Sequence, residues 1–509
     1  MLMVLFCCVR TQLSCRGVRE GSRRQPIWSP GLKSTETPVA ILRSCGLLKA
    51  PPRPRPLLQL PSPITNHQIH SHLLDIMAAK GVVDKQARSH GYDFGGPLGV
   101  GAISILAPSV SFLLYFGCNQ HGCPPTHLNW AQYVEQVLPT REQFFSLEVL
   151  GYFAAYVFGL ALLNVTIPVR DRIGTLLKTG ERLVYNLNAL ETFIPMMGAL
   201  AFGTYLNGWE WSFWTWVWDH YLHLLTAANL FSFVLACGIY LASFRPSKPL
   251  LAAGGNTGNH IYDWFIGREL NPRIGKLDIK LFCELHPGMM GWAILNLAFA
   301  AHQFQTIGRV TDSMILVNIF QFWYIFDAFW NEPAILTTMD ITSDGFGYML
   351  SFGDLAWVPF TYSLQGRYLA MYPLDLGVAG VAGVLLVQGI GYYIFRGANG
   401  QKNAFRTNPE DPSLKHLKYI ETKTGRKLLI SGWWGMSRHI NYLGDWIMGW
   451  AWCLPTGFGT WVTYFYVGYF AVLLINRERR DDGHCRIKYG DDWKRYTGIV
   501  KSRIVPGIY

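Results

Sequence analysis

The chain is predicted to be an all-α polytopic membrane protein with about ten transmembrane helices and no Rossmann domain. Its residues are 50% hydrophobic and 15% aromatic, and only 15% are charged, whereas soluble globular proteins average about 25% charged residues. Several apolar stretches are long enough to cross a hydrocarbon layer of roughly 30 Å. No Gly-x-Gly-x-x-Gly sequence lies between a strand and a helix, which a dinucleotide-binding Rossmann domain requires.

The predicted spans are nearly uninterrupted apolar stretches that cover residues 96–116, 146–169, 189–207, 224–244, 288–305, 312–330, 376–395 and 445–475. The last stretch is long enough for a hairpin of two helices, and a shorter candidate covers 350–364. Gly377, Gly380 and Gly383 lie inside one span, where small residues favour close helix packing over pyrophosphate binding.

Loop charge predicts the orientation of these spans, because cytosolic loops are rich in Lys and Arg. The basic residues that follow spans are Arg170, Arg172, Lys178, Arg182, Arg245, Lys248, Arg396, Lys402, Arg406 and Arg477 to Arg480. The connection from Trp209 to His223 has no Lys or Arg and is rich in Trp, which suits the opposite membrane interface. Both termini are therefore predicted to face the cytosol.

Residues 1–76 differ in composition from the rest. They hold ten basic and three acidic residues, +7 of the formal net charge of +11, together with a run of prolines from 51 to 63. We expect this extension to be disordered and the main body not to bind nucleic acid. Two explanations fit this composition: a transit peptide, or a start codon placed too far upstream. The second is favoured, with Met77 as the natural first residue. Residues 77–91 would be a short cytosolic segment.

Cys118 and Cys123 fall in the first predicted exterior loop. A disulfide there and two unpaired thiols are equal alternatives. His121 lies between them, but the number and spacing of ligands do not suit a metal site, and no metal is expected.

Polar residues beside the last spans point to a binding site. Burying a charge in hydrocarbon costs about 3 kcal/mol, so Arg438, Asp445 and Asp481 need partners or a ligand. Lys402 and Arg406 are four residues apart and would share one face of a continuing helix, where they could bind the 2′-phosphate of NADPH. An ordinary positive-inside flank is the alternative for these basic residues.

A second set of polar residues lies at the end of the aromatic-rich span 312–330. Tyr324, Asp327 and Glu332 lie there, and an acid held in low dielectric keeps its proton and could donate it to an apolar substrate. Asp340, Asp344 and Asp354 follow, and periodicity does not choose among these carboxyl groups.

Two long blocks carry a family resemblance. One runs from Gly258 to Arg273 and ends in Leu-Asn-Pro-Arg, and the other runs from Arg480-Asp481 through Cys485 and Lys488-Tyr489-Gly490 to Trp493. Together they resemble the membrane sterol reductases that use NADPH, a family that includes the lamin B receptor. The resemblance covers residues 92–509. Within the family, the stretches Asp263–Arg273 and Phe282–Gly288 are most similar to fungal reductases of the sterol 14,15 double bond. One departure is His286, where Arg is expected in many relatives.

The resemblance implies a multi-pass protein of the endoplasmic reticulum membrane that takes NADPH from the cytosol and sterol from the bilayer, with 376–509 as the main NADPH-binding part. The cofactor residues it implies are Lys402, Arg406, Trp434, Arg438, Asn441, Tyr442, Arg477, Asp481, Tyr489, Trp493 and Tyr496. Asp445 would orient Arg438 or touch the ligand.

The implied reaction adds a proton to carbon 15 of the sterol and hydride to the resulting cation at carbon 14. The predicted catalytic residues are Tyr324, directly or through a water relayed from Asp327 or Glu332, and Asp481. The predicted substrate-binding residues are Tyr324, Trp330 and Trp434.

Three alternatives stay open at this point. One is reduction of the sterol 7,8 or 24(28) double bond. Another is a non-catalytic sterol-binding scaffold, although the extension shows no pattern of a folded domain. The third is a di-iron hydroxylase, for which His220 and His223 provide only one weak pair.

Overall fold

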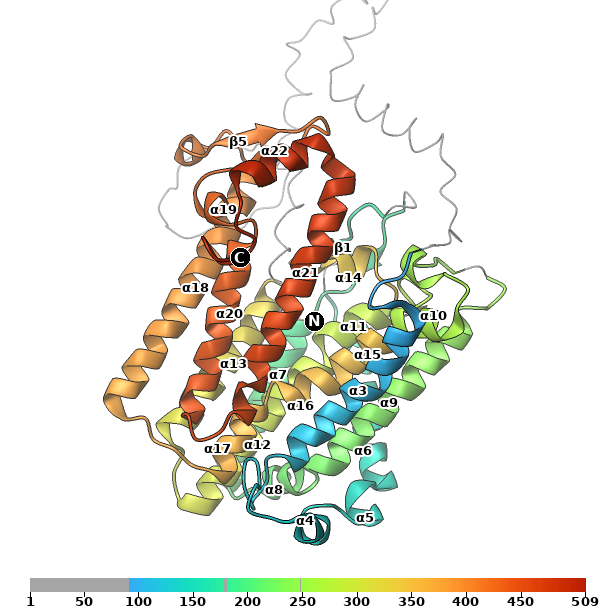
Figure 1. Ribbon diagram of the computed structural model, residues 1–509. Coiled ribbons are helices and arrows are strands. Elements are labelled where there is room, and N and C mark those ends of the chain that lie inside the picture. The colour runs from blue at the N-terminus through green and yellow to red at the C-terminus, as the bar shows by residue number, and fades with distance from the viewer. Residues whose placement is uncertain (1–90, 170, 178–180, 248) are drawn as a thin grey trace, which may run out of the picture. The chain divides into compact units, whose positions relative to one another are not determined.

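The computed structural model describes residues 91–169, 171–177, 181–247 and 249–509 (Figure 1). The predictions for residues 1–76 and for nearly all of 77–91 therefore lie outside the described residues. The described part is built of helices, with three short hairpins between them.

Six helices of the described part are long and apolar enough to cross a membrane. They are α3 (Gly96–Phe116), α6 (Leu147–Thr166), α7 (Ala189–Asn207), α9 (Tyr221–Ala242), α13 (Asp312–Trp330) and α18 (Gly377–Thr407). The predicted spans 96–116, 189–207 and 312–330 agree with helices residue for residue. The chain is thus a multi-pass helical membrane protein, as predicted.

The predicted span 288–305 is α12 (Pro287–Ile307), which lies inside the bundle, with Ala298, Phe299 and Ala301 fully buried. A helix that is apolar on all sides is expected in such a position. The weak candidate 350–364 is a broken run of α15 (Tyr348–Phe352), a π-helix (η3, Gly353–Trp357), α16 (Val358–Thr361) and α17 (Leu364–Met371).

The stretch 445–475 forms the predicted helical hairpin, from α20 (Ile440–Cys453) and α21 (Phe465–Tyr489). Helix α20 packs closely along α18 (Figure 1). A Cβ atom on Gly444 would come within 2.8 Å of the Gly391 carbonyl oxygen and within 2.6 Å of the Phe395 nitrogen. Glycine at 444 therefore permits the contact that holds the two helices together.

The prediction that Gly377, Gly380 and Gly383 permit close helix packing is wrong. Within the described part of the chain, a Cβ atom on Gly377 or Gly383 would meet nothing within 4 Å, and one on Gly380 would meet only Leu376. Gly377 instead begins α18 with a positive φ of 67°, a conformation that glycine adopts without strain. Close helix packing depends instead on small residues further along α18, where this helix faces α20.

The remaining helices are short: α4 (Trp130–Gln136), α5 (Arg141–Phe144), α8 (Ser212–Asp219), α10 (His260–Ile266), α11 (Ile279–Leu285), α14 (Met339–Thr342), α19 (Trp433–Met436) and α22 (Asp491–Ile499). Three antiparallel hairpins were not predicted: β1 (Arg172–Ile173) with β2 (Val184–Tyr185), β3 (Arg273–Ile274) with β4 (Leu277–Asp278), and β5 (Tyr419–Glu421) with β6 (Lys427–Leu429). They are too short to give a periodic signal, and the all-α class is unchanged.

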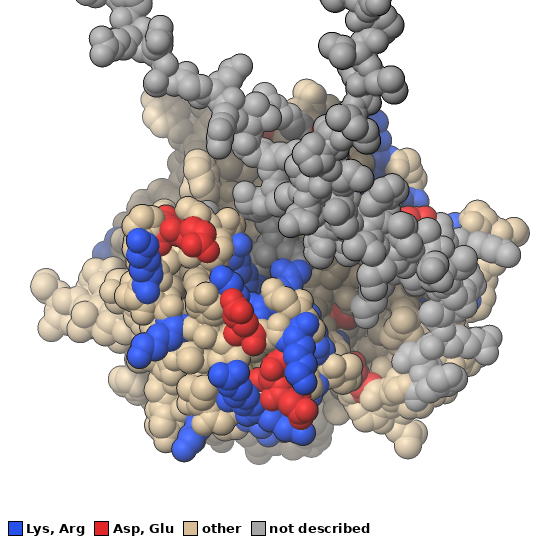
Figure 2. Space-filling view, turned by 90° about the horizontal axis from the view of Figure 1, so that it is seen from above, with Lys and Arg blue, Asp and Glu red and all other residues tan. Residues whose placement is uncertain are grey.

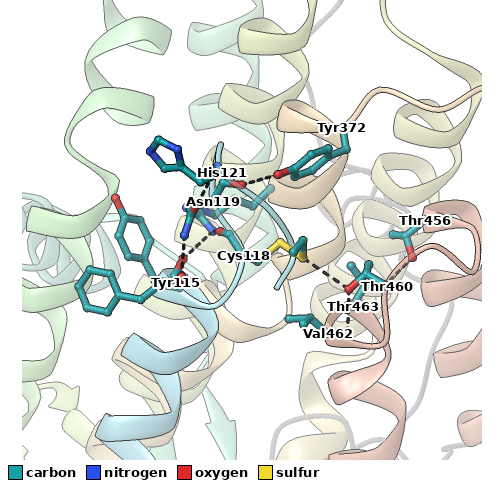
Figure 3. Close-up of a disulfide and its surroundings, with 12 residues drawn as sticks. Tyr115, Cys118, Asn119, His121, Tyr372, Thr456, Thr460, Val462 and Thr463 are labelled. Carbon is teal, nitrogen blue, oxygen red and sulfur yellow. Dashed lines mark hydrogen bonds between the residues drawn. A yellow bond between two sulfur atoms is a disulfide. The ribbon is translucent and has the colours of Figure 1, made fainter. Parts of the chain in front are cut away.

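Cys118 and Cys123 form a disulfide in the turn after α3 (Figure 3). This confirms the first of the two alternatives. The carbonyl oxygen of Cys118 accepts a hydrogen bond from Arg367 at 2.6 Å, and the Tyr372 hydroxyl donates to the carbonyl of Asn119 at 2.5 Å. The turn thus fastens the end of α3 to α17 and the residue that follows it.

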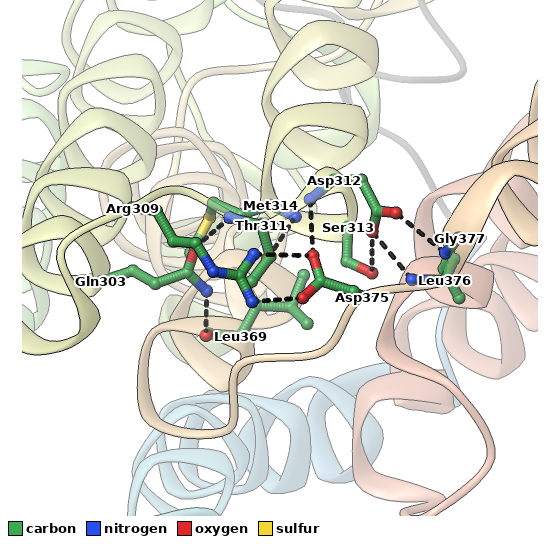
Figure 4. A network of polar contacts seen from close by, with 10 residues as sticks. All are labelled: Gln303, Arg309, Thr311, Asp312, Ser313, Met314, Leu369, Asp375, Leu376 and Gly377. Atoms are coloured by element: carbon green, nitrogen blue, oxygen red, sulfur yellow. Dashed lines mark hydrogen bonds and ion pairs between the residues drawn. The ribbon is translucent and has the colours of Figure 1, made fainter.

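A polar network fixes the start of α18 (Figure 4). The Asp312 carboxylate accepts hydrogen bonds from the backbone nitrogens of Leu376 at 2.8 Å and Gly377 at 3.0 Å. Arg309 binds both oxygens of Asp375. Because anions stabilise helix N-termini, this network ties α18 to the turn between α12 and α13. The opposite end of α18 carries Lys402 and Arg406.

Candidate functional site

A polar cavity of about 330 Å³ lies at the end of the bundle where β5, α19 and α22 are found. Viewed from that end, Lys and Arg side chains gather there, interspersed with Asp and Glu (Figure 2). Ten of the eleven predicted cofactor residues line this cavity: Lys402, Arg406, Trp434, Arg438, Asn441, Tyr442, Asp481, Tyr489, Trp493 and Tyr496. The eleventh, Arg477, lies just behind it.

Helix α18 brings Lys402 and Arg406 to the cavity because it continues without a break to Thr407. The two residues share one face, as their spacing predicted. The Lys402 ammonium lies 3.9 Å from the centre of the Trp434 ring, an attractive cation–π contact. Trp434 is held by a hydrogen bond from its indole nitrogen to the Ala398 carbonyl at 2.8 Å.

Arg438 is held by Asp482, which the sequence analysis did not single out. Its guanidinium lies 2.9 Å from Asp482 Oδ1, and both side chains are buried. The same oxygen accepts a hydrogen bond from the Trp493 indole at 2.9 Å. Burial raises the pKa of Asp482, but the bond from Trp493 and the charges of Arg486 and Arg438 outweigh burial and lower it. Asp482 is therefore an anion that orients a wall of the cavity.

Asp445, the predicted alternative partner of Arg438, lies elsewhere. It is fully buried in α20, where it interacts electrostatically with Tyr362 and Tyr466. Of the two roles expected for Asp445, orienting Arg438 is wrong, because Asp482 on α21 is the partner of Arg438.

His439 is a cavity residue that the sequence reasoning missed. Its ring stacks on Tyr442 with centroids 4.7 Å apart. Burial lowers the pKa of His439 to about 4, so the ring is neutral at neutral pH. The other missed lining residues are Thr337, Met339, Phe405, Lys427, Leu428, Leu429, His484, Cys485 and Lys488. Of these, Lys488 and Cys485 stood in the second block of the family resemblance, which was the available signal.

A second cavity, of about 260 Å³ and largely apolar, lies between α3, α15, the π-helix and α21. Most of its walls are apolar or aromatic, among them Phe94, Ile103, Tyr348, Trp357 and Tyr469. One end is polar and is formed by Asp340, Asp344, Asn476, Arg477 and Arg480. This arrangement suits an apolar ligand that has one reacting group directed toward charged side chains.

Arg477 and Asp481 connect the two cavities. In the polar cavity, the Tyr442 hydroxyl donates to Asp481 at 3.2 Å. Asp481 lies 3.9 Å from the Arg477 guanidinium, which lies 3.7 Å from Asp340 in the apolar cavity. Arg477 is buried, so this chain of contacts is shielded from water. Charge interactions are stronger in such a low-dielectric environment than in water.

The predicted catalytic residues at the end of α13 line neither cavity. Tyr324 packs against Trp292 and Trp452, and Asp327 forms an ion pair with Arg396. Glu332 accepts hydrogen bonds from the backbone nitrogen of Ala189, and burial raises its pKa to about 8. The structure therefore does not bring these three residues together with Asp481.

The two tryptophans predicted to bind substrate are also separated. Trp330 is 65% exposed on the outside of α13 and stacks on Phe326. Trp434 lines the polar cavity, beside Lys402. They do not form one pocket.

These features define a multi-pass membrane protein in which a basic, aromatic-walled cavity adjoins an apolar one. The model of the ergosterol biosynthesis ERG4/ERG24 family matches residues 88–509. The chain belongs to that family, which confirms the resemblance to sterol reductases.

Relatives with high identity cover nearly the whole matched region. The chain is 51% identical over 426 residues to the delta(14)-sterol reductase of Ascobolus immersus, covering 82% of this chain and 99% of the relative. It is 50% identical over 436 residues to delta(14)-sterol reductase erg24 of Schizosaccharomyces pombe, covering 85% and 100%. A third relative, delta(14)-sterol reductase ERG24A of Gibberella zeae, is 46% identical, covering 85% and 100%.

Proposed function

We propose that this chain is a delta(14)-sterol reductase that reduces the sterol 14,15 double bond with NADPH in ergosterol biosynthesis. Its relatives of 44–51% identity are named for that activity. The observation that supports the proposal is that Arg477 lies near both Asp481 of the polar cavity and Asp340 of the apolar one, because a polar and an apolar ligand bound in the two cavities would then have their reacting ends close together.

The lining of the polar cavity fits a dinucleotide with several phosphates. Among the described residues, five basic side chains and one acidic side chain line it: Lys402, Arg406, Lys427, Arg438, Lys488 and Asp481. Tyr489 stacks on Trp493, and Trp493 contacts the tilted ring of Tyr496, so one wall is aromatic, which suits a planar base. Lys402 and Arg406 would hold the 2′-phosphate. NADPH bound here would supply hydride.

The apolar cavity would hold the sterol, with its alkene toward Arg477. We assign the proton to the Asp340–Asp344 pair at the polar end, in place of Tyr324, Asp327 and Glu332. Burial, and then repulsion from Asp340, raise the pKa of Asp344. A raised pKa keeps a proton on a buried carboxyl group, so Asp344 would be the donor, next to Asp340 and Arg477.

The same reasoning gives an orientation in the membrane. The basic residues around the polar cavity would face the cytosol, where NADPH is available, and the disulfide turn would face the lumen of the endoplasmic reticulum. Glycosylation sites inserted in the turn at 119–122 should be modified, whereas sites inserted at 423–425 should not. The reverse result would contradict the proposed orientation.

The activity is tested with the full chain expressed in membranes of a host that lacks its own enzyme. An 8,14-diene sterol and NADPH should give the 14,15-saturated product, while NADH should serve poorly. Asp344→Asn should stop the reaction, with NADPH binding retained. Turnover of a 7,8 or 24(28) alkene in place of the 14,15 alkene would overturn the substrate assignment. Full activity of Asp344→Asn would overturn the assignment of the proton donor.

A further inference from the structure

The backbone just before α3 is strained at Phe94, in a turn formed by residues 92–95 that we call the strained turn. Among the described residues, Phe94 is the only one other than glycine with φ in the left-handed region, at 54°. Gly95 and Gly96 follow with φ values of 77° and 70°. Glycine adopts this conformation freely, whereas a bulky side chain destabilises it. Strain of this kind is typical of functional sites, so the side chain at 94 calls for an explanation.

Neighbouring groups hold the strained turn in place. A Cβ atom on Gly99 would lie 1.9 Å from the Phe94 carbonyl oxygen, so glycine at 99 lets the turn fold back onto α3. The backbone nitrogen of Asp93 donates to the Tyr262 hydroxyl at 2.8 Å. The Tyr92 ring meets the same Tyr262 edge to face, with centroids 4.8 Å apart. The turn is therefore fastened both to α3 and to α10.

The Phe94 ring forms part of the wall of the apolar cavity. It meets the ring of Phe265, another lining residue, edge to face with centroids 6.4 Å apart. Glycine at 94 would relieve the strain but leave this part of the wall open. The strained backbone is thus explained by the place that it gives to an aromatic ring.

Arg480 on α21 shows that this ring lies at the polar end of the cavity. Its guanidinium lies over the Phe94 ring, 5.8 Å from the ring centre. It also lies 3.6 Å from the Asp93 carboxylate and 3.7 Å from that of Asp344. One side chain therefore contacts both the strained turn and the proposed proton donor. A substrate whose alkene reaches Asp344 would lie beside the Phe94 ring.

We propose that Phe94 is a specificity-determining residue that contacts the sterol next to its reacting double bond. The inference rests on the proposed function, which turns the 14,15 alkene of ring D toward Asp344. Because the strained turn is held on both sides, the Phe94 ring has a defined position and leaves little room for extra bulk on ring D. In an apolar pocket, one methylene group more or less changes kcat/KM by roughly 10- to 200-fold.

The test compares two substrates of the full chain in membranes. One is an 8,14-diene sterol, and the other is the same sterol with an additional methyl group on carbon 16, which adjoins carbon 15. The wild type should use the methylated sterol poorly. Phe94→Ala leaves space where the ring was, so the ratio of kcat/KM for the methylated sterol to that for the parent should rise about tenfold or more. The KM for NADPH should not change, because Phe94 does not line the polar cavity.

Phe94→Gly separates the contact from the strain. It removes the ring and also suits the left-handed backbone, so it should be more heat-stable than Phe94→Ala and show the same rise of the ratio. Phe458→Ala is the matched control, because the Phe458 ring is exposed and lines neither cavity. It should keep the ratio of the wild type.

The inference is overturned if Phe94→Ala and Phe94→Gly keep the wild-type ratio, or if they lower kcat/KM for both sterols by the same factor, as a purely structural residue would. Displacement of a fluorescent sterol from the purified protein gives the same comparison as a ratio of Kd values, without turnover. A wild type that binds the sterols but reduces neither would contradict the proposed function, and the Kd ratio would then decide the role of Phe94 alone.

Discussion

Asp482 holds the guanidinium of Arg438 at 2.9 Å in a buried ion pair beside the polar cavity. Removing one partner of such a pair leaves the other charge buried and costs about 3–5 kcal/mol. Asp482→Asn should therefore lower the thermal stability of the detergent-purified protein and weaken NADPH binding at least tenfold, measured by fluorescence titration. Asp491→Asn is the control, since its ion pair with Lys494 is exposed and contributes little. Equal effects of the two substitutions would contradict the role given to Asp482.

Lys402 and Arg406 are expected to distinguish NADPH from NADH. A charge-assisted hydrogen bond contributes about 1.5–3 kcal/mol, so Lys402→Gln or Arg406→Gln should raise the KM for NADPH by roughly tenfold to a hundredfold and change the KM for NADH much less. Lys415→Gln, outside the polar cavity, should affect neither. An equal loss with both cofactors would show that the two residues do not bind the 2′-phosphate.

His439 gives the free energy of unfolding a dependence on pH. Burial lowers its folded pKa to about 4, against about 6.5 in an unfolded chain. Between these values the unfolded state binds more protons, so stability is full above pH 6.5 and falls as the pH drops toward 4. With allowance for the partial exposure of the ring, the loss should be on the order of 2 kcal/mol.

His439→Asn should flatten this dependence. Thermal unfolding of the protein without cofactor, followed between pH 4 and pH 7.5, measures it. His416→Asn is the control, because that side chain is exposed. Wild type and His439→Asn with parallel curves would rule out His439 as the titrating group.

The sequence predicts local features of the site well. The spacing of Lys402 and Arg406 indicates a shared helix face because α18 continues past the membrane. The partner of Arg438 is harder to predict from the sequence. Asp481 and Asp482 are neighbours whose side chains point in directions about 100° apart on a helix, and only the packing of the helices decides which of them contacts Arg438. The contacts of the acids near the end of α13 are likewise set by packing. Asp327, on α13, forms an ion pair with Arg396, and Glu332, two residues after the helix, binds the start of α7, so neither reaches the cavities.

Gly444 is expected to be essential for the contact between α18 and α20. A side chain there would meet the backbone of Phe395 and Gly391, so Gly444→Ala must push the helices apart, and overpacking of this kind costs about 1–3 kcal/mol. Because α18 carries Lys402 and Arg406 and α20 carries Tyr442, the shift should also weaken NADPH binding. Gly383→Ala is the matched control, because Gly383 lies on α18, the helix that Gly444 packs against, but has open space around it in the described structure. Thermal stability and NADPH titration of both variants measure the effect, and a Gly444→Ala protein that behaves like Gly383→Ala would contradict the close packing of these helices.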